Sequence, residues 1–362
     1  YFLYPLPFKG NWPVWSATTF LLSLTVLGAT WLVWCLDFLR AIAQKYSLSG
    51  ALGWHYIRGA TEPEVPPAII ITTVSILAAI ACLLAGVMAL VLFYVDLLTG
   101  IRSDALLMKN PTFFFGHVLV NISLYLGVAV IYDVLPQYCE RPWKANKIVA
   151  ISWNSVLAIV LMAYFHHLYM DFVQPKTFQY IGQVASYMSS LPAAVVTVFG
   201  ALSLVFHARM RWNLTSGLFL LSLMGWAIGG MGAVIDSTIA VNFKFHNTLW
   251  VPAHFHTYML GGLVLMVLGY FYHYLQEITK LPENWNSQKR ILGMIVLGGY
   301  GFLMMFYVSG ANSVPRRFAI YPAEVAHGAS YSGVGAVFAS IYLLGMLFYA
   351  VETGRRWLSA RG

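Results

Sequence analysis

The chain has 362 residues, of which 59% are hydrophobic and only 9% are charged, and its mean hydropathy is +0.71. This composition excludes a soluble globular domain and predicts an integral membrane protein. The formal net charge is +8, but membrane topology explains the basic residues, so the charge does not indicate binding to nucleic acid.

Nine stretches of the sequence carry no formal charge, and each can cross the hydrocarbon core as a helix of about 20 residues. They are residues 14–36, 67–95, 112–132, 148–170, 180–206, 213–235, 249–276, 291–311 and 329–351. The predicted fold class is therefore an all-α, polytopic membrane helix bundle. We expect residues 1–362 to form a single transmembrane domain.

The connections between these spans are short, which predicts antiparallel neighbours and two sets of connections on opposite sides of the membrane. One set holds 7 of the 21 basic residues, and the other set with the C-terminal tail holds the remaining 14. Because cytoplasmic connections are enriched in Lys and Arg, the N-terminal segment is predicted outside and the C-terminus in the cytoplasm. The predicted location is a bacterial or archaeal cytoplasmic membrane.

Six histidines lie inside or at the ends of the uncharged spans, and antiparallel packing places five of them toward the outer, periplasmic side. These five are His117, His166, His167, His254 and His256. An ionisable side chain in a membrane span is costly and usually serves a function. The sixth, His273, lies at the inner end of its span and is interpreted as an interfacial side chain.

The spacing of the five histidines predicts two kinds of site. His166 and His167 diverge by about 100° on a helix, so they could share an ion only at a seam with another helix, where His117 would complete the set. Three imidazoles with an open position suit a reactive copper, iron or zinc ion. His254 and His256 point about 200° apart, so each could be an axial ligand of a different haem.

Further polar residues are predicted on the same side. Arg316 and Arg317 follow Pro315, and His246 precedes Trp250 at the start of the seventh span. Paired arginines are typical of interfacial anchors, and their guanidinium groups equally match the propionates of haem.

Together these motifs resemble subunit I of the haem-copper oxidase superfamily, from its fourth helix to its twelfth. The matching segments are FFFGH ending at His117, the pair His166 and His167, HNTLWVPAHFH from His246 to His256, and VPRR ending at Arg317. The third segment is most similar to the B-type branch. The complete family fold has twelve helices. The first three are expected to be missing here, because the chain begins at Tyr1 in a stretch typical of a connection between helices.

The resemblance implies a role for each matching residue. His117, His166 and His167 would hold the non-haem metal, with copper favoured and iron as the alternative. His254 would bind a high-spin haem and His256 a low-spin haem. The haem propionates would be bound by His246, Arg316 and Arg317. The implied partners are an electron donor of the cupredoxin or cytochrome c type, other membrane subunits and the lipid bilayer, with no nucleic acid.

Two departures from oxygen-reducing relatives bear on the substrate. Relatives of the A and B types carry a tyrosine one helical turn after the first metal-binding histidine, where this chain has Asn121. In the B-type relatives, hydroxyl side chains line the inner proton route, whereas the best-aligned positions here are Ala193, Val196 and Phe199, with Tyr132 as a lone hydroxyl. Asn121 is the predicted catalytic residue, because an amide can position a bound diatomic by hydrogen bonding, although it could equally satisfy a neighbouring group.

The favoured hypothesis is a terminal reductase that takes electrons through the low-spin haem to the high-spin haem and non-haem metal and reduces NO to N2O. Its active-site character is closest to the nitric oxide reductases of the superfamily. The alternative in the same class is an oxygen reductase that forms water. Alternatives from other classes are a proton transporter without redox chemistry and a non-catalytic subunit derived from an oxidase.

Overall fold

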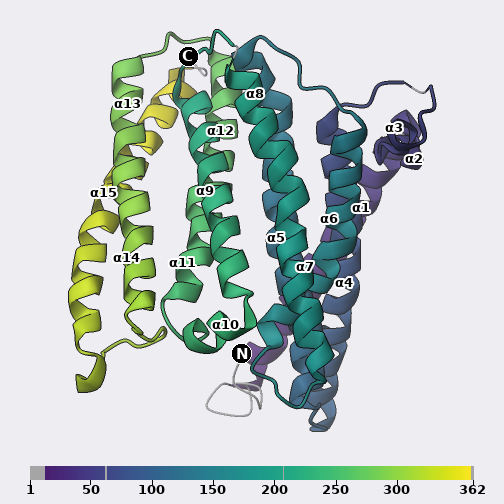
Figure 1. Ribbon diagram of the computed structural model, residues 1–362, viewed down its shortest axis with the longest axis vertical. Coiled ribbons are helices and arrows are strands. Elements are labelled where there is room, and N and C mark those ends of the chain that lie inside the picture. Colours follow the sequence, from purple (N-terminus) through teal and green to yellow (C-terminus); the bar gives the residue numbers. More distant parts are fainter. Residues whose placement is uncertain (1–12, 62, 207, 360–362) are drawn as a thin grey trace. The chain divides into compact units, whose positions relative to one another are not determined.

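A computed structural model describes residues 13–61, 63–206 and 208–359, and almost all of its elements are helices (Figure 1). Nine helices in this described part are long and apolar enough to cross a membrane, and it contains no β-strand. The prediction of a polytopic helical bundle is confirmed. The N-terminal stretch that the sequence assigns to a connection lies outside the described residues.

The chain divides into two compact units. Unit 1 comprises residues 1–126 and 145–192, and unit 2 comprises residues 127–144 and 193–362. The boundaries fall within α5 (Ala105–Cys139) and near the end of α7 (Lys176–Ala194). The single domain expected from the sequence stays a prediction.

Unit 1 is built from long helices whose apolar faces pack on one another. Its elements are α1 (Val14–Tyr46), α2 (Leu48–Ala51), α3 (Trp54–Arg58), α4 (Pro67–Thr99), the first part of α5, α6 (Lys147–Ala163), the 3₁₀ turn η2 (Tyr164–Leu168) and most of α7. Fully buried residues of α1, α4 and α5, among them Cys35, Ile76 and Val118, form its core. This core fixes the helix that carries His117.

Unit 2 contains the rest of α5 and all later elements. These are η3 (Val195–Phe199), α8 (Gly200–Phe206), α9 (Leu214–Asp236), α10 (Ile239–Phe245), α11 (Trp250–His256), η4 (Thr257–Leu263), α12 (Val264–Thr279), α13 (Trp285–Met294), η5 (Ile295–Tyr300), α14 (Gly301–Ala311), η6 (Ala323–Val325) and α15 (His327–Ser359). The elements η3, η4 and η5 are π-helical turns within longer spans. A Cβ atom at Gly225 would collide with the backbone of Gly261, so glycine permits the close approach of α9 and η4.

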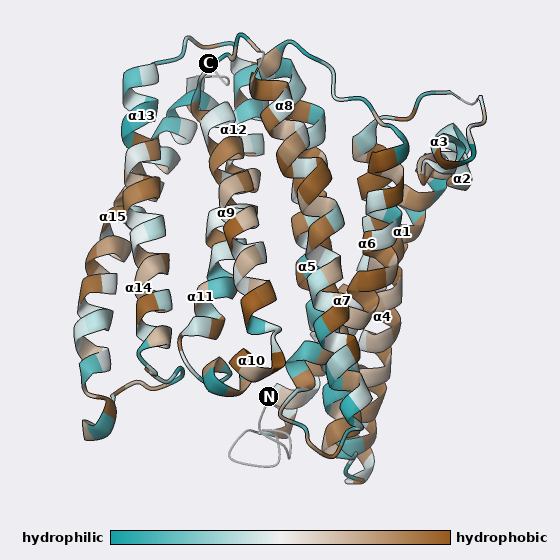
Figure 2. Ribbon diagram, viewed as in Figure 1, coloured by the Kyte–Doolittle hydropathy of each residue, from teal (hydrophilic) through white to brown (hydrophobic). Residues whose placement is uncertain are grey.

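The helices extend beyond the uncharged stretches of the sequence. The first runs to Tyr46, past Asp37 and Arg40, and α5 begins at Ala105 rather than near residue 112. Hydrophilic residues gather at helix ends and connections, while apolar residues occupy much of the helix middles (Figure 2). Charged side chains near the end of a span can reach the interface with water, so a helix need not stop at the first charge.

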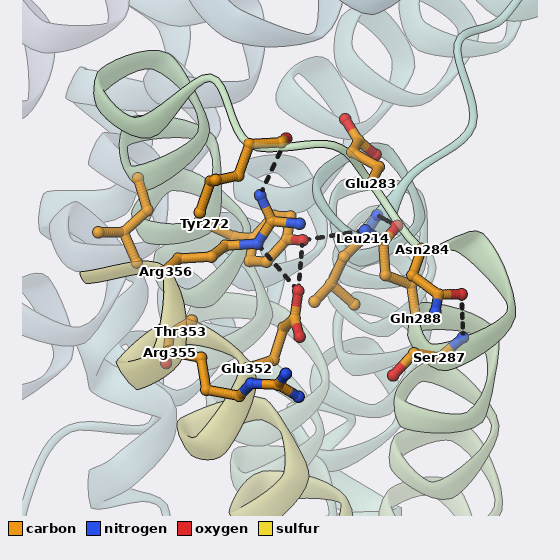
Figure 3. A network of polar contacts seen from close by, with 12 residues as sticks. Leu214, Tyr272, Glu283, Asn284, Ser287, Gln288, Glu352, Thr353, Arg355 and Arg356 are labelled. Atoms are coloured by element: carbon orange, nitrogen blue, oxygen red, sulfur yellow. Dashed lines mark hydrogen bonds and ion pairs between the residues drawn. The ribbon is translucent and has the colours of Figure 1, made fainter. Parts of the chain in front are cut away.

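A buried polar network joins the ends of α9, α12, α13 and α15 within unit 2 (Figure 3). Arg356 is 4% exposed, and its Nε donates to Glu352 Oε1 at 2.9 Å. The hydroxyl of Tyr272 donates to Glu352 at 3.3 Å and accepts from Gln288 Nε2 at 2.9 Å. Gln288 Oε1 in turn accepts from the backbone N–H of Leu214 at 2.9 Å. The network therefore ties the first turn of α9 to α13, α12 and α15.

We predict that Arg356→Met lowers the stability of the protein, because it leaves the part-buried Glu352 carboxylate without its cation. Breaking a buried ion pair costs about 3 kcal/mol or more. Thermal unfolding of the purified protein measures the effect, and Arg355→Met is the control, because Arg355 is exposed on the same helix. Equal melting temperatures for the two variants would contradict a stabilising role of the network.

Candidate functional site

Unit 1 brings three histidines together, one from α5 and two from η2. One ring nitrogen from each of His117, His166 and His167 lies within 4.8 Å of the others. Nδ1 of His117 is 3.3 Å from Nε2 of His167, and the ring centroids of His117 and His166 are 5.0 Å apart. Within the described ranges, this is the only group of three or more His, Cys, Asp or Glu side chains with such spacing.

The adjacent pair lies on a 3₁₀ turn and not on the α-helix that the sequence pattern predicts. Successive residues of a 3₁₀ turn are separated by about 120°. The rings of His166 and His167 are 4.1 Å apart and tilted by 43°, and both meet His117 where η2 lies beside α5. The seam with a second helix, which the sequence analysis required for a shared ion, is therefore present.

Ser186 on α7 determines which nitrogen of His166 is available to a metal. Its Oγ lies 2.8 Å from His166 Nδ1 and donates its single hydrogen to the carbonyl of Gly182 at 2.6 Å. The hydroxyl must therefore accept from His166 Nδ1–H, which leaves Nε2 as the nitrogen with a lone pair. Three neutral nitrogen donors of this kind fit a borderline metal such as copper, iron or zinc.

Sequence reasoning missed Ser186. It is 5% exposed and lies one helical turn after Gly182 on α7. A Cβ atom at Gly182 would lie 2.9 Å from the backbone nitrogen of His166, so glycine allows α7 to approach the histidine pair closely. The sequence signal for this contact was a small residue, Gly182, followed one helical turn later by a residue with a hydroxyl group, Ser186.

Asn121, the predicted catalytic residue, lies one turn after His117 on α5. Its Nδ2 donates to the backbone carbonyl of His117 at 2.8 Å and lies 3.4 Å from His117 Nε2. The structure therefore places the Asn121 amide beside the ring nitrogen of His117 that faces away from His167.

In unit 2, His254 on α11 faces α9. A Cβ atom at Gly232 would lie 3.0 Å from the Cβ of His254, and His254 Nε2 lies 3.9 Å from Asp236 Oδ2. Glycine at position 232 thus leaves room for the backbone of His254 against α9.

His256, two residues later, faces a different helix. Its ring lies 5.4 Å from the ring of Phe306 on α14, and its Nδ1 donates to the carbonyl of Pro252 at 2.7 Å. Because Nδ1 carries the hydrogen, Nε2 is the nitrogen that could bind an iron atom. His254 and His256 thus face different helices, α9 and α14.

The connection from α14 to α15 lies beside the segment that precedes α11. The backbone N–H of Arg316 donates to the carbonyl of Asn247 at 2.9 Å, which places Arg316 next to the segment of His246. Burial lowers the pKa of the half-buried Arg316 guanidinium. The neighbouring Arg317 lowers this pKa further, whereas Asp236 raises it. Arg316 Nε has no hydrogen-bond partner among the described residues, so it fits an anionic group such as a haem propionate.

One expectation about the inner proton route is wrong. The hydroxyl of Tyr132 is not alone, because it lies 3.1 Å from the hydroxyl of Thr197, which is fully buried. Thr197 belongs to the π-helical turn η3, where an extra residue per turn changes which side chains face α5. Phe199, one of the aligned positions, is 67% exposed on that turn.

Comparison with known proteins identifies one family. The model of the family described as "Cytochrome C and Quinol oxidase polypeptide I" matches residues 1–343. Cytochrome c oxidase subunit 1 of Thermus thermophilus is 26% identical over 373 residues, covering 95% of this chain and 62% of the relative. The protein of the same name from Cereibacter sphaeroides is 25% identical over 263 residues, covering 70% of this chain and 45% of the relative.

A solved structure has a similar fold. It is described as a heme-copper terminal oxidase dimer, and it superposes with a TM-score of 0.68 at 19% identity, covering 81% of this chain and 57% of that chain. This likeness concerns the fold alone. The chain spans less than two thirds of the length of these relatives.

We predict that Ser186→Ala weakens binding of the non-haem metal about tenfold to a hundredfold, the usual effect of removing the hydrogen-bond partner of a histidine ligand. Competition with a chelator measures the affinity in the purified protein. Ser189→Ala is the matched control, because the Ser189 hydroxyl donates to a carbonyl of the same helix, that of Ser186. Equal affinities in the two variants would show that Ser186 does not orient His166.

Proposed function

The chain belongs to the cytochrome c and quinol oxidase polypeptide I family, and we propose that it is the catalytic part of a membrane-bound terminal oxidoreductase that reduces O2 to water. Two observations support this proposal. The family match extends over most of the chain, and the structure gathers the three histidines of unit 1 into one group.

We propose that each histidine position holds a cofactor. His117, His166 and His167 would hold a non-haem metal, with copper favoured over iron because divalent copper binds nitrogen donors more tightly than divalent iron does. His254 would bind the high-spin haem and His256 the low-spin haem. When bound, these groups supply the electrons and the open coordination position that reduction of a diatomic requires.

The chain's own residues would orient these groups and keep water away. Ser186 and the carbonyl of Pro252 fix the hydrogen-bearing nitrogens of His166 and His256. Arg316 would hold a propionate by a charge-assisted hydrogen bond, with His246 and Arg317 beside it. Apolar residues of the surrounding helices would limit access of water to the site.

The choice of O2 over NO rests on the relatives. Those reported above are named cytochrome c oxidase subunit 1, which supports the oxygen reductase alternative better than the nitric oxide reductase favoured by the sequence analysis. NO reduction to N2O is the second candidate, because Asn121 and not a tyrosine lies beside His117 Nε2. Coupling two NO molecules requires no cleavage of an O–O bond.

Partners and location follow from the same proposal. The chain would work with an electron donor of the cupredoxin or cytochrome c type and with other membrane subunits, embedded in the lipid bilayer. The distribution of basic residues supports a cytoplasmic C-terminus and a reaction site toward the outer side.

We predict that His254→Ala and His256→Ala remove different haems. The two side chains face different helices, so the loss of one ligand should leave the other haem in place. Optical and EPR spectra of the purified variants should show loss of the high-spin component in the first and of the low-spin component in the second. Loss of one and the same component from both variants would contradict the assignment of two haems.

Turnover by the purified complex distinguishes the two substrates. We predict reduction of O2 to water, measured with an oxygen electrode, at a rate above that of NO reduction to N2O under anaerobic conditions. The reverse order of rates would favour the nitric oxide reductase. A colourless protein with neither activity would contradict both candidates and restore the transporter alternative.

A further inference from the structure

A charged pair joins α5 to the segment that follows the turn η2. Lys109 Nζ lies 2.6 Å from Asp171 Oδ1, although the two residues are 62 positions apart in the sequence. The Lys109 side chain is 46% exposed and the Asp171 side chain is 19% exposed, so the pair is only partly sheltered. Lys109 lies near the start of α5, and Asp171 follows the end of η2 by three residues. The pair therefore ties the beginning of α5 to the end of η2.

Backbone hydrogen bonds hold Asp171 to the end of η2. Its N–H donates to the carbonyl of Leu168 at 3.0 Å, and its own carbonyl accepts from the N–H of Gln174 at 3.0 Å. The position of the Asp171 carboxylate is therefore coupled to the position of the turn that carries His166 and His167.

A row of side chains on α5 leads from Lys109 to the histidine group. Phe113 follows Lys109 by four residues and His117 follows Phe113 by four, so the three lie on one side of the helix. The ring of Phe113 stacks on the ring of His167, with centroids 5.3 Å apart and planes tilted by 13°. The ion pair, the stacked rings and the contact of His117 with His167 therefore join the same two parts of unit 1 in succession.

The turn η2 depends on its neighbours because of its own geometry. It has only five residues, and the hydrogen bonds of a 3₁₀ turn have poorer geometry than those of an α-helix. Toward α5 it is held by Phe113, by the ion pair and by a hydrogen bond from the Tyr164 hydroxyl to Asn110 Oδ1 at 3.3 Å. Of these three contacts, only the ion pair joins opposite charges, so it alone can be tested by reversing the charges.

We propose that Lys109 and Asp171 are positioning residues of the metal site, which hold η2 against α5 and thereby slow the release of the metal. Without the pair, η2 moves away from α5 more often. His166 and His167 then separate from His117 together, and the metal loses two of its three ligands at once. The inference rests on the proposed metal site but not on the choice between O2 and NO.

Neutral variants test the proposal. We expect Lys109→Met and Asp171→Asn each to speed the withdrawal of copper from the purified complex by a chelator about threefold to fivefold, because a partly exposed ion pair contributes modestly. In about 1 M salt the difference from the unchanged protein should shrink, since salt screens exposed charges. Lys176→Met is the matched control, because Lys176 is exposed at the start of α7 and forms no ion pair with the described residues.

Reversal of both charges separates the ion pair from other effects of the substitutions. Lys109→Asp and Asp171→Lys each place like charges together and should release copper faster than the neutral variants do. The two changes combined should restore slow release. Hydrogen exchange of the backbone amides of residues 164–171 is a second measurement that needs no metal, and we expect it to be faster in Lys109→Met than in Lys176→Met.

Three results would overturn the proposal. They are equal copper release from Lys109→Met and Lys176→Met, a combined variant that releases copper as fast as the single reversals, and amide exchange that is unchanged in Lys109→Met. Absence of metal from the unchanged complex, together with faster amide exchange in Lys109→Met, would instead refute the metal site alone. The two failures are therefore distinguishable.

Discussion

The hydrocarbon core of a bilayer offers no hydrogen-bond partners, so a polar side chain within it must find one in the protein. The helices of this chain meet that requirement largely within one turn, because serine, threonine and asparagine side chains bond the carbonyl four residues earlier. Thr73, Ser75, Asn121, Ser123 and Thr257 all do so. This bond to the helix fixes the orientation of the side chain. Any further contact that the side chain makes therefore has a fixed direction as well.

This constraint explains how the candidate metal site is held. Ser186 Oγ donates its hydrogen to the carbonyl of Gly182 on its own helix and lies beside His166 Nδ1. In the same way, Asn121 Nδ2 donates to the carbonyl of His117 and lies beside His117 Nε2. Both side chains are neutral, so they orient the imidazoles without placing a charge in the apolar interior. A charged pair, Arg356 with Glu352, lies instead near the end of α15.

Fewer residues bear on the choice of substrate than on the binding of cofactors. Histidine spacing and the long family match concern the groups that the chain would bind, whereas one position beside His117 bears on what is done with a bound diatomic. An amide at position 121 cannot be oxidised as a phenol can. A phenol does contact that amide, because the hydroxyl of Tyr125 donates to Asn121 Oδ1 at 3.3 Å.

Composition, charge-free stretches and histidine spacing were enough to predict the nine spans and the grouping of His117, His166 and His167, because burial in a bilayer leaves a strong signal along the chain itself. The tertiary structure decided what depends on contacts between helices or on a local change of helix type. The 3₁₀ turn aims His166 and His167 toward His117, and the π-helical turn brings Thr197 to Tyr132. The role of Ser186 arises where α7 approaches η2, and the sequence hints at it only through Gly182 one turn earlier.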